Sequence, residues 1–95
     1  MLYLLTPQEQ TTLPGSYNAA FGHDTLDVNT TGSYNTGMGR ATLSENTTGQ
    51  FNSASGYVSL LNNTTGQKNT GSGAYSGVNL TTGIENTFIG YNAGG

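Results

Sequence analysis

Asparagine returns every 17 residues along most of this 95-residue chain, and two other motifs keep the same step. The asparagines are Asn18, Asn35, Asn52, Asn69 and Asn86. A glycine follows each of them four residues later, at Gly22, Gly39, Gly56, Gly73 and Gly90. Thr-Thr-Gly recurs in the same register, starting at Thr30, Thr47, Thr64 and Thr81. Because so short a unit cannot bury an apolar face without a neighbour, the pattern predicts a solenoid of stacked repeats.

We number each repeat from its asparagine, so that the glycine stands at position 5 and Thr-Thr-Gly at positions 13–15. Glycines at positions 5 and 15 are expected to supply positive φ angles at two corners, which separate two short extended segments. No segment keeps helical apolar spacing for three turns. The sequence therefore predicts an all-β parallel β-solenoid, or β-roll, of about five 17-residue coils over residues 16–95. The asparagines are expected to form a ladder along the stack, and residues 1–15 an N-terminal arm or cap.

The expected core is thin. Leucine occupies position 9 at Leu26, Leu43 and Leu60, but the next repeat has Gly77. Position 3 is small in most repeats: Ala20, Gly37, Ala54 and Gly71. At about 25 cal/mol per Å² of buried apolar surface, so few apolar groups barely offset an ordering entropy of roughly 1–2 kcal/mol per residue. We therefore expect a homo-oligomer and not a monomer.

Composition argues against several classes of function. Lysine and arginine together number 2, so no basic patch is available for nucleic acid. No run of 18 apolar residues is present, so no membrane span is predicted. His23 stands beside Asp24 without a placed nucleophile, and Asp24, Asp27 and Asn29 lack the ligand spacing of a calcium loop. The sequence predicts no catalytic residue, no cofactor and no metal, and hence not an enzyme.

Two sets of residues leave alternatives open. Tyr17, Tyr34 and Phe51 share one register, and Tyr57 and Tyr91 share another. Short stacked ladders that support folding are the favoured interpretation, and a carbohydrate-binding stripe, which would include Tyr75, is the alternative. Asn-x-Thr sequons begin at Asn29, Asn46, Asn62, Asn63 and Asn79. We interpret them as turn chemistry, with glycosylation as the alternative.

Residues 86–94 (Asn-Thr-Phe-Ile-Gly-Tyr-Asn-Ala-Gly) and the Asn-Thr-Thr-Gly-x-x-Asn-Thr junctions resemble the repeats of bacteriophage tail-fibre and related surface-fibre proteins. They are similar, more distantly, to the head repeats of trimeric autotransporter adhesins. The resemblance covers residues 16–95. It implies a parallel β-roll, usually trimeric, that serves as a shaft or an adhesin.

These observations predict a structural fibre or adhesin shaft subunit that self-assembles outside the cell, at the cell surface or on a virion, where a surface glycan or receptor is a possible partner. Ice binding and carbohydrate binding are the alternative functions. Either a trimer or a head-to-tail filament fits the sequence. In the filament, residues 86–95 and 11–17 of two copies would complete one coil. An assembly arm would then lock the joint by strand pairing, and it consists of Leu2, Tyr3, Leu4 and Leu5.

Overall fold

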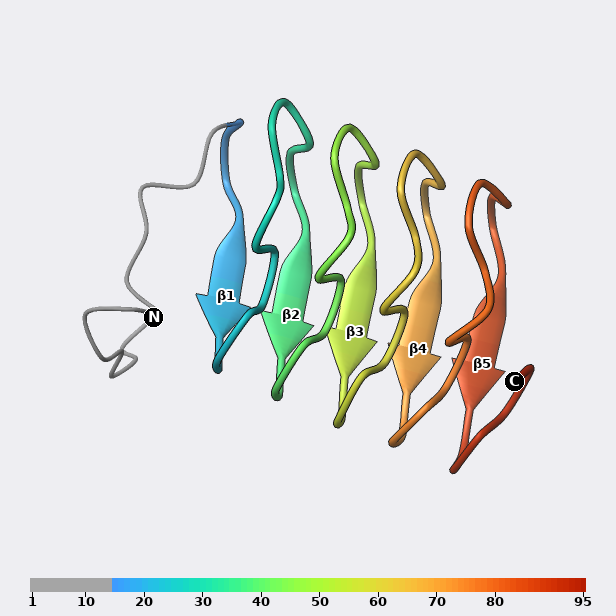
Figure 1. The fold of residues 1–95 in the computed structure, drawn as a ribbon. Coiled ribbons are helices and arrows are strands. Elements are labelled where there is room, and N and C mark those ends of the chain that lie inside the picture. The colour runs from blue at the N-terminus through green and yellow to red at the C-terminus, as the bar shows by residue number, and fades with distance from the viewer. Residues whose placement is uncertain (1–14) are drawn as a thin grey trace.

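The computed structural model describes residues 15–95, in which each coil carries one three-residue strand at the same place (Figure 1). The strands are β1 (Ala19–Phe21), β2 (Thr36–Met38), β3 (Ser53–Ser55), β4 (Thr70–Ser72) and β5 (Thr87–Ile89). The arm formed by Leu2, Tyr3, Leu4 and Leu5 lies outside the described residues, so its role stays a prediction.

The strands form one parallel sheet in chain order, β1 to β5. Each strand residue pairs with the residue 17 positions later, so that Ala20 lies opposite Gly37, and Gly37 opposite Ala54. The predicted parallel β-solenoid with 17-residue coils is confirmed. It comprises about four turns rather than about five, because residues 86–95 supply only the strand and first corner of a further coil.

The expectation of two extended segments per coil is wrong. After the strand, the chain bends at position 7 and again at position 9, where the residues adopt left-handed backbone angles. At position 9 the φ angles are 52° for Leu26, 50° for Leu43 and 51° for Leu60. A left-handed residue interrupts an extended segment, and leucine adopts this region rarely. These bends turn the chain back beneath the strand and place the leucine side chain inside the coil, where it is at most 1% exposed.

The two repeated glycines have different roles. At position 5, all five glycines have φ between 117° and 127°, the region that favours glycine. At position 15, Gly32, Gly49, Gly66 and Gly83 do not have positive φ, so that part of the expectation is wrong. Lack of space explains the glycine there, because a Cβ on Gly49 would clash with the carbonyl oxygen of Gly66 and with Oδ1 of Asn46.

The apolar core lies between the strands and the position-9 turn. It consists of Leu26, Leu43 and Leu60 from the turn, with Ala20 and Ala54 from position 3 of the strands. Leu80 and Phe88 are partly buried and pack against this cluster. Position 3 faces inward and positions 2 and 4 face outward, as alternation along a strand requires.

Candidate functional site

A ladder of asparagines runs along the stack at position 1, buried at its three middle members and partly buried at its ends. The backbone N–H of each asparagine from the second coil onward donates to Oδ1 of the asparagine one coil earlier, at 2.9–3.0 Å. In the first four members the side-chain Nδ2 also reaches across the coil: Asn35 donates to the carbonyl of Gly49 at 2.8 Å, and Asn52 to that of Gly66 at 2.9 Å. The ladder therefore joins neighbouring coils and braces the two sides of each coil. Its members are Asn18, Asn35, Asn52, Asn69 and Asn86.

A second ladder stands at position 12. Nδ2 of Asn46 donates to Oδ1 of Asn29, and Nδ2 of Asn63 donates to Oδ1 of Asn46, both at 2.9 Å. These three asparagines are at most 5% exposed, and each Nδ2 also donates to the glycine carbonyl three residues later. A glycan cannot be attached to such a nitrogen without opening the coil. Asn79 is the one sequon asparagine of residues 15–95 that is exposed.

The interior is thus polar as well as apolar. Burying an amide costs free energy unless it is hydrogen-bonded, whereas a satisfied bond contributes about 0.5–1.5 kcal/mol. No buried side-chain nitrogen or oxygen in the described part of the chain lacks a partner. A repeat with a single leucine per coil can therefore form an ordered interior.

The Thr-Thr-Gly motif joins coils at the turn that precedes each strand (Figure 1). The backbone N–H groups of Thr30, Thr31 and Gly32 all donate to the carbonyl oxygen of Thr47, at 2.9, 3.2 and 3.1 Å. The hydroxyl of Thr30 donates to the same oxygen at 3.1 Å, and that of Thr47 donates to Thr64 at 3.3 Å. The position-13 hydroxyls therefore point along the stack, while the position-14 threonines are exposed.

The strands present an outer sheet face, which we define as the side chains at positions 2 and 4 of β1–β5. None of them is charged: Ala19, Phe21, Thr36, Met38, Ser53, Ser55, Thr70, Ser72, Thr87 and Ile89. Met38 is 48% exposed and Ile89 is 68% exposed. The charged residues and the histidine of residues 15–95 occupy other repeat positions: His23, Asp24, Asp27, Arg40, Glu45, Lys68 and Glu85.

Two aromatic groups flank the strands. The aromatic stack, formed by Tyr17, Tyr34 and Phe51 at position 17, has ring centroids 5.0 Å apart at both contacts, with interplanar angles of 15° and 1°. The tyrosine row, formed by Tyr57, Tyr75 and Tyr91, has centroids 5.5 and 5.9 Å apart and angles of 83° and 77°.

Sequence register brought Tyr57 and Tyr91 together but not Tyr75, because Tyr75 stands at position 7. Its backbone is left-handed, with φ of 62°, and its coil carries the small Ala74 at position 6. The ring of Tyr75 therefore lies between the other two. The sequence carries a signal for this contact. Positions 6 and 7 are Tyr57 and Val58 in one coil but Ala74 and Tyr75 in the next, so the tyrosine has moved by one residue.

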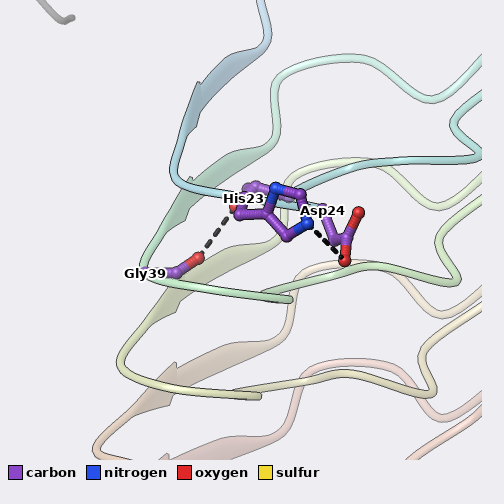
Figure 2. A network of polar contacts seen from close by, with 4 residues as sticks. His23, Asp24 and Gly39 are labelled. Atoms are coloured by element: carbon purple, nitrogen blue, oxygen red, sulfur yellow. Dashed lines mark hydrogen bonds and ion pairs between the residues drawn. The ribbon is translucent and has the colours of Figure 1, made fainter. Parts of the chain in front are cut away.

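On a corner of the first coil, Nε2 of His23 lies 3.3 Å from Oδ2 of Asp24 (Figure 2). Both side chains are 44% exposed. Next to them, the hydroxyl of Thr25 donates to the carbonyl of Gly39 at 2.8 Å and joins two coils. Within residues 15–95 no three histidine, cysteine or acidic side chains gather where they could hold a metal ion.

No protein-family model, curated protein or solved structure matches this chain. In the described part of the chain, no helix is long and apolar enough to cross a membrane. The ladders, the outer sheet face and the two aromatic groups are therefore the features from which a function can be inferred.

Proposed function

We propose that this chain is a structural shaft segment of an extracellular or virion fibre, and that copies of it associate side by side through the outer sheet face. The main support for this proposal is the composition of that face, on which five adjacent strands present ten uncharged side chains. Depletion of charged residues is the compositional signal that distinguishes the core of a protein interface from the rest of a surface.

The stability of one copy supports self-association. The fully buried apolar side chains of the described residues are three leucines and a few small groups. The ordering of backbone and side chains costs roughly 1–2 kcal/mol per residue, which a core of this size offsets only in part. Burial of the exposed Met38 and Ile89 against a neighbouring copy would add apolar contact that the thin core of one copy does not provide.

The repeats resemble those of bacteriophage tail fibres and trimeric adhesin heads, which favours three copies. A shaft needs mechanical continuity along its axis, and two asparagine ladders with the converging Thr-Thr-Gly bonds supply it. When the solenoid is pulled along its axis, the ladder bonds between two coils share the force with the hydrogen bonds of the sheet. The polar interior therefore suits a rod.

Ice binding is the second candidate, because position 14 forms an exposed threonine column of Thr31, Thr48, Thr65 and Thr82. The neighbouring position-13 hydroxyls are directed along the stack at carbonyl oxygens. A single outward column offers a line of hydroxyls and not a two-dimensional array, so the geometry favours the shaft.

Sedimentation velocity of the wild type and of a matched pair of variants tests the proposal. Ser55→Lys places a charge in the middle of the outer sheet face, and Thr65→Lys places the same charge in the Thr-Thr-Gly turn, which does not belong to that face; both side chains are exposed. We expect an oligomeric wild type, dissociation with a lower melting temperature in Ser55→Lys, and neither change in Thr65→Lys. A folded wild-type monomer, or equal effects of the two lysines, contradicts the proposal. Thermal hysteresis in the wild type would favour ice binding instead.

A further inference from the structure

The tyrosine row and the aromatic stack contain three rings each, but they leave different surfaces open. In a stacked contact, each ring covers one face of the other ring. Tyr34 lies between Tyr17 and Phe51 in near-parallel contact, so both of its ring faces are covered. In an edge-to-face contact only one of the two rings loses a face. The perpendicular contacts of the tyrosine row therefore leave most of its ring faces uncovered by the other two rings.

The tyrosine row also has free polar groups. Tyr57, Tyr75 and Tyr91 are 44%, 37% and 77% exposed. None of their phenol oxygens makes a hydrogen bond with another group of residues 15–95. Each ring thus combines an electron-rich face with a hydroxyl that can donate and accept. No charged residue stands at positions 6 or 7 of the three coils that carry the row.

We propose that the tyrosine row is a binding site for a linear oligosaccharide lying along the solenoid axis. The C–H bonds on one face of a sugar ring carry partial positive charge and pack on the negative face of an aromatic ring, while sugar hydroxyls bond to phenol oxygens. The repeated centroid separations of 5.5 and 5.9 Å offer one aromatic ring per coil to successive sugar units.

Size decides between a saccharide and a protein partner. An aromatic side chain buries about 150–250 Å² when fully covered, so three rings that are about half exposed offer on the order of 300 Å². A stable protein interface needs about 800 Å² from each partner. The row is one residue wide, with Ala74 and Val58 beside it, and a chain of two or three sugar units matches that width. The inference rests on the proposed function in one respect, since the row must remain on the outside of the fibre.

The test is NMR titration of the intact chain, with the tyrosine ring signals as the readout. The probes are four linear tetrasaccharides: the β-1,4-glucose, α-1,4-glucose and β-1,4-N-acetylglucosamine tetramers, and a hyaluronan tetrasaccharide as the anionic member. We expect at least one probe to shift the ring signals of Tyr57, Tyr75 and Tyr91 and to leave those of Tyr34 in place.

Matched variants sharpen the test. Tyr75→Ala removes the central ring of the row, and Tyr34→Ala removes the central ring of the aromatic stack. Loss of a stacking ring should weaken binding of that probe by about tenfold or more in Tyr75→Ala, whereas Tyr34→Ala should bind as the wild type does. Failure of all four probes to shift the row at about 10 mM, where even a millimolar dissociation constant gives saturation, would overturn the inference; so would equal weakening by both variants.

Sedimentation velocity on the same samples separates this inference from the proposed function. Tyr75→Ala should remain oligomeric, because its side chain is not on the outer sheet face. A variant that dissociates would show that the row is a contact between copies and not a saccharide site. An oligomeric wild type that binds no probe would leave the shaft proposal standing and remove only the site.

Discussion

The first three coils and the last stretch of the solenoid fill the same interior by different means. In residues 18–68, position 9 supplies the fully buried Leu26, Leu43 and Leu60 from the turn. In the next coil that position is Gly77. The space is taken by the ring of Phe88, the middle residue of β5, which stands at repeat position 3. A Cβ on Gly77 would lie 2.7 Å from Cδ2 of Phe88, and one on Gly94 would lie closer still.

The difference shows that the fold conserves interior volume and not the residue that provides it. In the first coils, position 9 of the turn is leucine and position 3 of the strand is small. Near β5 the turn has a glycine instead, and the strand supplies an aromatic ring. The polar ladder changes at the same place: position 12 is asparagine at Asn29, Asn46 and Asn63 but Leu80 in the fourth coil. An apolar pair, Leu80 and Phe88, therefore replaces part of the amide network near β5.

The largest expected difference between inner and last coils concerns the corner glycines. Gly56 and Gly90 share a φ of 117°, so alanine is equally strained at both. A Cβ on Gly56 would also lie 2.7 Å from the carbonyl carbon of Gly73, whereas nothing lies within 4 Å of one on Gly90. We expect Gly56→Ala to lower the free energy of unfolding by about 3 kcal/mol or more and Gly90→Ala by about 1–2 kcal/mol. Urea denaturation measures both, and equal losses would show that crowding between coils does not contribute.

The next comparison sets the middle of the asparagine ladder against its last member. Asn52→Ala removes the acceptor of the Asn69 N–H and the donor to the Gly66 carbonyl, both inside the stack. A buried group left unpaired costs about 1–3 kcal/mol, so we expect a loss of about 2–4 kcal/mol. Asn86 is only half-buried, and Asn86→Ala should cost about 1 kcal/mol. Urea denaturation measures both losses of unfolding free energy. A larger loss in Asn86→Ala than in Asn52→Ala would contradict a main stabilising role for the buried part of the ladder.

The smallest expected effect is the coupling between the two ways of filling the core. Gly77→Leu overpacks against Phe88, and Phe88→Ala leaves a cavity beside Gly77; each should cost about 1–3 kcal/mol. The double variant restores the leucine and small-residue pair of the first coils. It should be more stable than the sum of the single losses predicts, by about 1–2 kcal/mol. Additive losses would mean that Phe88 does not occupy the place of the missing leucine.

Much of this architecture could be predicted from the sequence, because a strict 17-residue step fixes the register of a parallel stack. The step aligned the asparagines and the position-5 glycines without knowledge of the path between them. The left-handed bends at Leu26, Leu43 and Leu60 could not be predicted, since leucine rarely adopts that conformation and only burial inside the coil offsets it. The contact of Tyr75 with Tyr57 and Tyr91 could not be predicted from register for a related reason, because a left-handed residue brings a side chain from position 7 into a column of position 6.

Buried asparagine amides hold the coils of this solenoid together. Hydrogen exchange of the side-chain amides, followed by NMR, tests their role without any substitution. Asn35, Asn52 and Asn69 are at most 1% exposed, whereas Asn79 and Asn92 are exposed and serve as internal controls. We predict that the Nδ2 protons of the three buried asparagines exchange far more slowly than those of the two controls. Equal exchange rates in the folded chain would contradict the ladder and, with it, the polar interior on which this solenoid depends.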